Sequence, residues 1–386
     1  MTSLRSPLRA IAAALAAAAL AGAGGCCSCA ASPGYTFLST AARSPPPAPA
    51  LAGPTLRVLH LADFGDATCQ QQAVAGGLLA EHRRAPFDVA FFGGDNLYDC
   101  GPDTRAAGAD RCAFAADGSS LAPGFAPPRD VLFGLHERPI ESLGDAPAAE
   151  VLLALGNHDI GEPASCRGSG DPGTARLRAC LEVAHRSAVW RMDGRHYVAD
   201  RGPARFLVVD SNLLLSDYGG FSIDDEVAFV AAESPGCRAD ACDAEPGGCA
   251  KPWCFLVAHH PAATAGSHGG DHTPEYGTRV ARLLEAGGGR IRAWLAGHDH
   301  DLQHLREPSG VDVLVSGNGA RGRGSERFET VEPAGAELVF ASVHWGFGVL
   351  EVADSGWRYR FESEAGEALY CCAADGAGRC EPVRCW

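Results

Sequence analysis

Residues of the types that bind metal ions recur along the chain, most of them just after a short apolar run. Carboxylate, amide oxygen, imidazole and phenolate are hard or borderline ligands that suit iron, zinc or manganese. Seven such ligands exceed what one tetrahedral ion uses, so two ions that share a bridging carboxylate are expected. No cysteine belongs to the set. Its members are Asp63, Asp95, Tyr98, Asn157, His259, His298 and His300.

The apolar runs before these residues have the length and composition of buried strands. They cover residues 56–62, 89–92, 151–155, 206–209, 255–258, 291–296 and 311–315. Residues 70–84 predict a helix, so the spacing from Asp63 to Asp95 fits one strand–helix–strand unit. Ligands of open α/β sheets bind at the carboxyl ends of strands. We therefore expect an α/β fold in which the polar residues converge on one site.

Composition and charge limit the classes of protein to consider. The chain has 386 residues, of which 46% are hydrophobic and 20% are charged, so a sizeable core is expected and global disorder is excluded. Acidic residues outnumber basic ones by 47 to 32, which gives a net charge of −15. This charge disfavours non-specific binding to nucleic acid or to an anionic membrane. An anionic substrate would therefore need a local cation or metal to attract it.

The N-terminal region predicts export. Arg5 and Arg9 precede the apolar stretch 10–22, and residues 1–30 together have the pattern of a signal peptide. Cys26 leaves a lipoprotein signal open as an alternative. Residues 31–55 are rich in Ala, Pro and Ser and predict a linker. The protein is thus expected to be periplasmic, extracellular, or anchored to the outer membrane or cell surface.

Sixteen cysteines point to an oxidising compartment. Thirteen of them follow the signal region, with clusters at 237–254 and 371–385. Disulfides are the favoured interpretation of both clusters. Structural zinc is the alternative, although neither cluster contains the close C-x-x-C pair that is usual for zinc.

Five short motifs in a fixed order resemble the calcineurin-like metallophosphoesterase superfamily. Within it, Tyr98 and the run 297–304 (GHDHDLQH) are similar to purple acid phosphatases of the small, tartrate-resistant mammalian type. The resemblance covers residues 56–369 as the catalytic domain and leaves 370–386 as a Cys-rich tail. It implies a four-layer αββα sandwich of two mixed sheets flanked by helices. The motifs are Asp63-Phe64-Gly65, Gly94-Asp95-Asn96-Leu97-Tyr98, Gly156-Asn157-His158-Asp159, His259-His260-Pro261 and Gly297-His298-Asp299-His300.

The resemblance also implies roles for single residues. An Fe(III) ion would be held by Asp63, Asp95, Tyr98 and His300, and a second divalent ion (Fe, Zn or Mn) by Asp95, Asn157, His259 and His298. Asp95 would bridge the two ions. The family places its ligand two residues before proline, which selects His259 over His260. His158 and His268 would contact the substrate phosphate, while Asp66, Asp99 and Asp159 would support the ligands or cap helices.

The function implied is that of an acid phosphatase, which hydrolyses phosphate monoesters by attack of a metal-activated hydroxide. Its partner would be a small phosphorylated substrate, with no nucleic acid as a structural partner and with membrane contact only through a lipid anchor. A phosphodiesterase or nucleotidase of the same fold remains an alternative, as does an inactive, Cys-rich surface binding protein. The segments 100–112, 166–180 and 237–254 carry cysteines and depart from the mammalian type, so they are expected to rim the site and influence substrate choice.

Overall fold

A computed structural model describes residues 34–161, 166, 172–237, 253–322, 328, 330–375 and 378–386. The predicted signal peptide, Cys26, Cys242 and Cys249 lie outside these residues. Among the described helices, none is both long enough and apolar enough to cross a bilayer.

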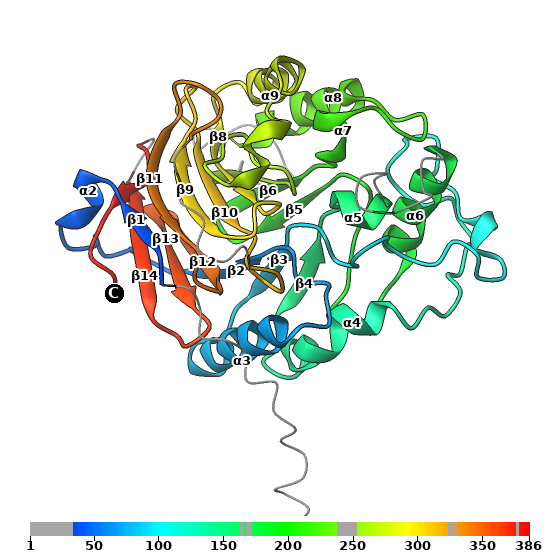
Figure 1. Cartoon of the computed structure of the whole chain (residues 1–386), viewed down its shortest axis with the longest axis horizontal. Helices are drawn as coiled ribbons and strands as arrows, with labels where there is room; N and C mark the ends of the chain where they lie inside the picture. Colours follow the sequence, from blue (N-terminus) through cyan, green and yellow to red (C-terminus); the bar gives the residue numbers. More distant parts are fainter. Residues whose placement is uncertain are drawn as a thin grey trace, which may run out of the picture. The chain divides into compact units, whose positions relative to one another are not determined.

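Two mixed β-sheets form the centre of the fold (Figure 1). The first contains, in spatial order, β1 (Thr36–Leu38), β11 (Glu337–Ser342), β9 (Leu302–Arg306), β10 (Asp312–Ser316), β8 (Ile291–Ala296), β7 (Trp253–Val257), β6 (Ala204–Val208) and β5 (Tyr197–Arg201). The second contains β15 (Glu381–Pro382), β14 (Ala368–Asp375), β13 (Gly356–Ser363), β12 (Gly346–Ala353), β2 (Leu56–Leu61), β3 (Val89–Phe92) and β4 (Glu150–Leu153). Each predicted apolar run corresponds to one of these strands.

The two sheets pack face to face through large apolar side chains. The ring centroids of Phe91 in β3 and Phe206 in β6 are 4.6 Å apart, and those of Phe255 in β7 and Trp357 in β13 are 5.5 Å apart. These four side chains belong to one buried core. Apolar rings of this size each bury a large area, so their contact stabilises the face-to-face arrangement of the sheets.

Helices flank the sheets, as predicted. The α-helices are α2 (Thr40–Arg43), α3 (Cys69–Arg84), α4 (Phe133–Glu137), α5 (Asn157–Ile160), α6 (Pro172–Ala184), α7 (Asn212–Leu215), α8 (Ile223–Glu233) and α9 (Pro274–Ala286). Four 3₁₀ segments accompany them in the described chain: η1 (Ala109–Arg111), η2 (Arg138–Gly144), η3 (Ser234–Gly236) and η4 (Ser267–Asp271). The prediction of a helix over 70–84 is confirmed by α3, which begins at the N-cap Thr68.

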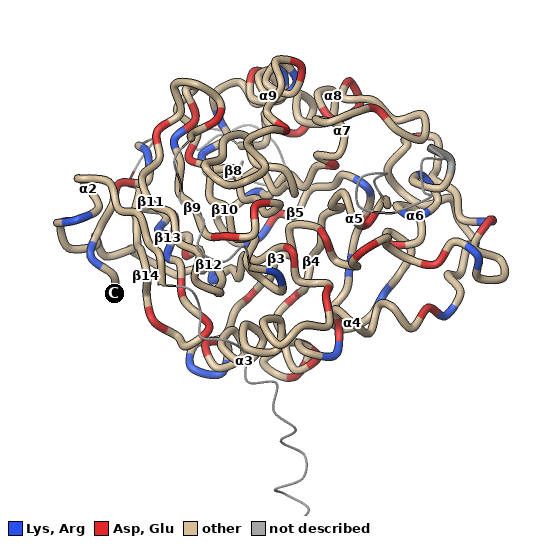
Figure 2. The backbone as a smooth tube through the Cα atoms, viewed as in Figure 1, with Lys and Arg blue, Asp and Glu red and all other residues tan. Residues whose placement is uncertain are grey.

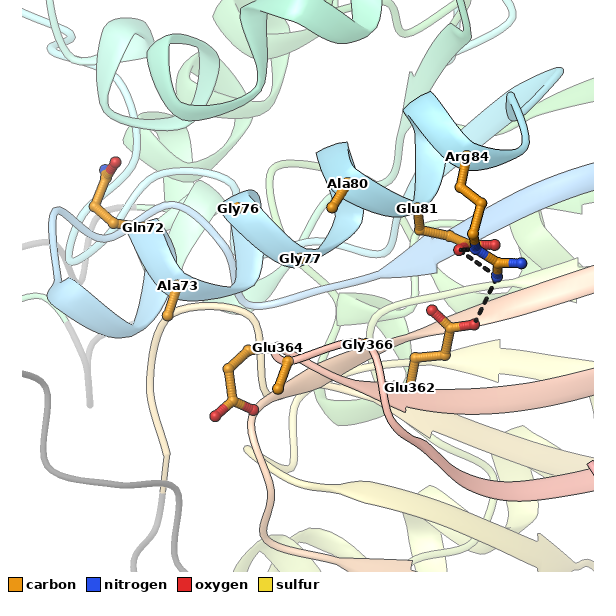
Figure 3. Close-up of a pocket in the computed structure, with 11 residues that line it drawn as sticks. Gln72, Ala73, Gly76, Gly77, Ala80, Glu81, Arg84, Glu362, Glu364 and Gly366 are labelled. Carbon is orange, nitrogen blue, oxygen red and sulfur yellow. Dashed lines mark hydrogen bonds and ion pairs between the residues drawn. The ribbon is translucent and has the colours of Figure 1, made fainter.

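Helix α3 lies against the second sheet through contacts with β12 and with the turn between β13 and β14 (Figure 3). Two adjacent glycines face different surroundings there. Gly76 is exposed, whereas a Cβ on Gly77 would meet the backbone carbonyl of Glu364. A pocket of about 550 Å³ opens between the helix and this turn, and none of the predicted ligands is among the residues that line it.

Two terminal segments differ from the prediction. Residues 31–55, expected as a linker, include β1, which pairs antiparallel with β11 at the edge of the first sheet. Residues 370–386, expected as a separate tail, include most of β14 and all of β15, which extend the second sheet. Strands of two or three residues carry too little periodicity to be read from sequence, because pairing with a sheet edge defines them.

The predicted disulfides are present for most of the cysteines described. The pairs are Cys100–Cys166, Cys112–Cys180, Cys237–Cys254, Cys371–Cys385 and Cys372–Cys380. These bonds exclude structural zinc for the C-terminal cluster and for Cys237 and Cys254. Five disulfides are typical of proteins that fold outside the cytosol.

Candidate metal centre

The sheet topology brings the predicted ligands to one edge. Strands β2, β3 and β4 are parallel neighbours, and so are β7 and β8. Their carboxyl ends therefore point the same way within each sheet. Asp63, Asp95 and Asn157 follow the first three strands, while His259 and His298 follow the other two.

Three predicted ligands form one contact group. The Tyr98 hydroxyl donates to Asp63 Oδ1 at 2.9 Å and lies 3.2 Å from His300 Nε2. His300 Nε2 is 3.4 Å from the same Asp63 oxygen. Phenol, carboxylate and imidazole thus present their ligand atoms to one small volume.

A second group lies beside the first. His259 Nε2 is 3.0 Å from Asn157 Oδ1 and 3.4 Å from Asp95 Oδ1. Ligand atoms of Asp63, Asp95 and His259 all fall within 4.8 Å of one another, which joins the two groups. All three residues are buried. Buried carboxylates surrounded by neutral donors are suited to a cation, so this donor set fits a metal centre.

His298 lies beside these groups. Its backbone N–H donates to Asp63 Oδ2 at 2.8 Å, and its ring centroid is 5.1 Å from that of His259. Its Nε2 atom is 3.0 Å from Asp271 Oδ2, a contact that the sequence does not predict. The predicted substrate histidine His268 stacks on this ring, with centroids 3.9 Å apart.

Strained backbone coincides with the predicted ligands. Asp63, Asp95 and His298 have φ values of 56°, 53° and 72°, and they are the positive-φ non-glycine residues recorded in the described chain. Such conformations cost about 1–3 kcal/mol each and cluster at functional sites. Gly156 and Gly297 lie where a Cβ would meet Asp95 and Asp63, so glycine lets the ligand loops approach closely.

Electrostatics within the site are strongly coupled. Burial alone would raise the pKa of Asp63, but the neighbouring imidazoles His259 and His300 lower it overall. Burial would lower the pKa of His259, whereas Asp95 and Asp63 raise it. Burial and the same two carboxylates raise the pKa of Tyr98 well above its ordinary value. The phenol of the metal-free protein therefore keeps its proton, and a strong Lewis acid is needed to displace it.

His158 faces the site from the start of α5. Its backbone N–H donates to Asp95 Oδ1 at 2.9 Å, and its ring meets Tyr98 edge-on at 4.3 Å. Its Nδ1 atom is 2.9 Å from the carbonyl oxygen of Asp99. Since a carbonyl oxygen only accepts, Nδ1 carries the hydrogen and Nε2 is the nitrogen left for other contacts.

Asp159 supports the loops that carry the ligands. Its carboxylate accepts hydrogen bonds from the backbone N–H groups of Asn96, Leu97 and Gly156 at 2.7–2.9 Å. The prediction that Asp159 acts as a partner of the ligand loops agrees with these contacts. A carboxylate that ties two loops together fixes the separation of Asp95 and Asn157.

His259 and His260 have different surroundings, although ligand atoms of both lie within 4.8 Å of one another and of one of His298. His259 Nε2 points to Asn157 and Asp95, whereas His260 Nδ1 is paired with the Ser211 hydroxyl at 3.0 Å. His260 is completely buried, so of the two positions open to it, beside the ligands or at the surface, the structure shows the first. Its side chain packs against His298, with centroids 4.4 Å apart.

Arg321 is a second residue at the site that the sequence does not reveal. Its guanidinium carbon lies 3.8 Å from the centroid of the Tyr98 ring. Its nitrogens pair with Asp66 at 2.6 Å and Asp99 at 2.5 Å, so both carboxylates, which sequence placed beside the ligands, orient this cation. No motif of the loop after β10 indicates such a contact.

Charge around the site is mixed. Acidic positions are spread along the backbone, including the loops after β2 and β3, and basic positions are interspersed with them (Figure 2). The chain as a whole carries −15. Attraction of an anion therefore depends on local cations, in keeping with the prediction from composition.

Comparison with known proteins agrees with this geometry. The sequence is 29% identical over 119 residues to purple acid phosphatase 7 of Arabidopsis thaliana and 27% identical over 123 residues to human tartrate-resistant acid phosphatase type 5. These matches cover 31% and 30% of this chain. The chain spans about a third of the length of these relatives, 34% and 35% respectively.

Solved structures share the fold at low sequence identity. GAP50, the anchor in the inner membrane complex of Plasmodium, superposes with a TM-score of 0.58 at 16% identity and covers 84% of this chain and 90% of its own. Purple acid phosphatase PPD1 from yellow lupin superposes with a TM-score of 0.55 at 13% identity, and the match covers 84% of this chain and 54% of the lupin chain. The sequence model of the calcineurin-like phosphoesterases matches residues 56–302. The chain belongs to the calcineurin-like phosphoesterase family.

Proposed function

We propose that this protein is an exported acid phosphatase that hydrolyses phosphate monoesters at a binuclear metal centre. The observation that carries the proposal is the convergence of Tyr98 with Asp63 and His300 beside the Asp95, Asn157 and His259 group. Members of this family use a binuclear metal centre, and a phenol in that position favours a ferric ion in one of its sites.

The donor atoms divide between two ions in this proposal. Fe(III) would be held by Asp63, Asp95, Tyr98 and His300, and a divalent iron, zinc or manganese ion by Asp95, Asn157, His259 and His298. When bound, such ions supply Lewis acidity and acidify the water that attacks phosphorus. Asp95 lies within reach of both groups and is the proposed bridge.

The protein's own residues orient the substrate and move protons. His158 has its Nδ1 hydrogen committed to the Asp99 carbonyl, so Nε2, which lies 3.8 Å from Asp95 Oδ2, is the atom proposed to contact the substrate phosphate. His268 lies on the other side of the centre, next to His298. The role proposed for both rings is to stabilise phosphate charge and, as imidazolium, to donate a proton to the leaving oxygen.

A paired rate measurement tests the proposal. The mature protein, loaded with iron and zinc at mildly acidic pH, is given a nitrophenyl phosphomonoester and the bis-nitrophenyl diester. A monoester preference is expected, and Asp95→Ala should abolish both metal retention and activity. A diester preference would replace the monoesterase assignment by a phosphodiesterase of the same centre. Absence of hydrolysis of either ester would favour an inactive, Cys-rich binding protein.

Export is inferred separately from the predicted signal peptide and the five disulfides. N-terminal sequencing and the mass of the protein after secretion would test it. A start near residue 24 supports cleavage by a signal peptidase, whereas a lipid-modified Cys26 identifies a lipoprotein. An intact Met1 in a cytosolic fraction contradicts export.

A further inference from the structure

We propose that Asp271 is a positioning residue that fixes the ring orientation and the protonated nitrogen of both His298 and His268. The inference deepens the proposed function, on which the roles of the two histidines rest. Asp271 belongs to none of the predicted ligand or substrate motifs, and it lies at the end of η4, three residues after His268.

One carboxylate oxygen serves both rings. Asp271 Oδ2 is 3.0 Å from His298 Nε2 and 3.0 Å from His268 Nδ1. The two imidazoles lie against each other with centroids 3.9 Å apart and an interplanar angle of 33°. His298 is almost fully buried, while the side chains of His268 and Asp271 are 31% and 39% exposed. The carboxylate thus lies at the rim and reaches inward to a buried ring.

The chemistry of these contacts determines which ring nitrogens are available. An ionised carboxylate only accepts hydrogen bonds, so His298 Nε2 and His268 Nδ1 must both carry hydrogen. A neutral imidazole has one N–H, which leaves Nδ1 of His298 with a lone pair for a metal ion. The same reasoning leaves His268 Nε2 with the lone pair of that ring, as the atom available to a substrate. Asp271 therefore selects the functional nitrogen of each ring.

The loop that carries Asp271 is held by other contacts. The backbone N–H of His268 donates to Asp299 Oδ1 at 2.9 Å, and the other Asp299 oxygen accepts from the Thr264 hydroxyl. The backbone N–H of Ala265 donates to Gln303 Oε1 at 2.7 Å. Since none of these bonds involves the Asp271 side chain, its replacement should leave the loop in place.

Metal binding by the same three side chains is the competing explanation. Ligand atoms of His268, Asp271 and His298 lie within 4.8 Å of one another, which suits a cation as well as hydrogen bonds. In that case zinc would replace the two hydrogens, and all three residues would be ligands of an additional ion. The two explanations differ in the state of the nitrogens and in the number of ions bound.

Nitrogen-15 NMR distinguishes the two explanations. It is recorded on the zinc-loaded full chain with labelled histidines. We expect His268 Nδ1 and His298 Nε2 to be protonated in the unsubstituted protein. In Asp271→Ala, His268 should become a mixture of the two neutral forms. Asp271→Asn keeps the size of the side chain and should give an intermediate result. Glu275→Gln is the matched control, because Glu275 is an exposed carboxylate of α9 that pairs with Arg279.

Release of zinc to a chelator provides a second measurement. Loss of a carboxylate that orients a metal-binding histidine weakens metal affinity about 10–100-fold. Asp271→Ala should therefore release one zinc ion faster by this factor, and Glu275→Gln should release it at the original rate. Thermal unfolding of each variant would establish that the fold is kept.

Three results decide the matter. Unchanged protonation and zinc release in Asp271→Ala would overturn the proposal. The proposal would also be overturned if the protein bound an additional zinc ion through His268 and His298 and Asp271→Ala lost that ion. If the NMR spectra are as expected but the protein hydrolyses neither phosphate ester, the proposed function is contradicted and the positioning role of Asp271 still holds.

Discussion

Tyr98 is held by groups from four separate segments of the chain. Its hydroxyl contacts Asp63 and His300, and its ring contacts His158 and the guanidinium of Arg321. The phenol is buried and its pKa is raised, so it cannot ionise without help from a cation. Under the proposed function, this residue is the one that favours a ferric ion at its site.

Replacing Tyr98 by phenylalanine should remove the colour of the iron-loaded protein. Purple acid phosphatases owe their colour to the bond between the phenolate and ferric ion, so loss of the hydroxyl removes the visible band. The visible absorption spectrum measures it. Tyr197→Phe is the control, because Tyr197 donates to the Leu153 carbonyl away from the ligands. A band that survives in Tyr98→Phe would rule out Tyr98 as the ligand.

Arg321→Met should shift this band to longer wavelength. A cation above an aromatic ring stabilises its electrons by on the order of 1 kcal/mol, so its removal makes the phenolate a better electron donor. Arg176→Met is a matched control, since Arg176 lies 4.2 Å above the Phe221 ring. An unchanged band in the Arg321 variant would show that the stacked cation does not act on the phenolate.

Helix α3 is fixed by a cap at its start and by close packing on the second sheet. Its N-cap Thr68 also donates to the carbonyl of Ala320, one residue before Arg321. The helix further packs on the β13–β14 turn at Gly77 (Figure 3). The start of α3 is therefore tied to the loop that carries the stacked cation.

The adjacent glycines of α3 should respond to alanine in opposite directions. Gly76→Ala should stabilise the protein by about 0.5–1 kcal/mol, because its Cβ would meet no atom within 4 Å and alanine favours the helix. Gly77→Ala should destabilise it by about 1–3 kcal/mol, because the Glu364 carbonyl occupies the space. Chemical denaturation measures both. Equal effects of the two substitutions would contradict the packing described.

At the scale of the whole molecule, the proposed acidic working range conflicts with buried histidines. Burial lowers the pKa of His60 and His136 from 6.5 to about 3. The folded state therefore binds fewer protons than the unfolded state between these values, and the free energy of unfolding falls as the pH drops from 6.5 towards 3. The five disulfides between described cysteines oppose this loss because they restrict the unfolded chain.

His136→Phe should make the protein less sensitive to acid. The ring of His136 lies among Phe64, Phe92 and Trp190, so an apolar ring suits its surroundings. Between pH 7 and 4.5, the fall in the free energy of unfolding should be smaller by about 3 kcal/mol than in the unsubstituted protein. Denaturation curves at the two pH values measure the difference. An equal fall in both proteins would mean that His136 does not ionise on unfolding in this range.

The sequence by itself determined seven of the described strands and the polar residues that follow them. Buried strands need continuous apolar runs, and their ends are marked by polar residues, so Asp63, Asp95 and Asn157 could be placed at one sheet edge in advance. The order of the motifs then indicated the family. These features depend on residues that are close together in the sequence, so local sequence patterns predict them.

The tertiary structure alone decided which groups surround those residues. Asp271 meets His298 across 27 positions of sequence, and Arg321 meets Asp99 across 222. Such contacts depend on how loops from different strands pack after the two sheets come together, and no local periodicity encodes them. The edge strands β1 and β15 are further examples, because two or three residues become strands only when a sheet edge offers them hydrogen-bond partners.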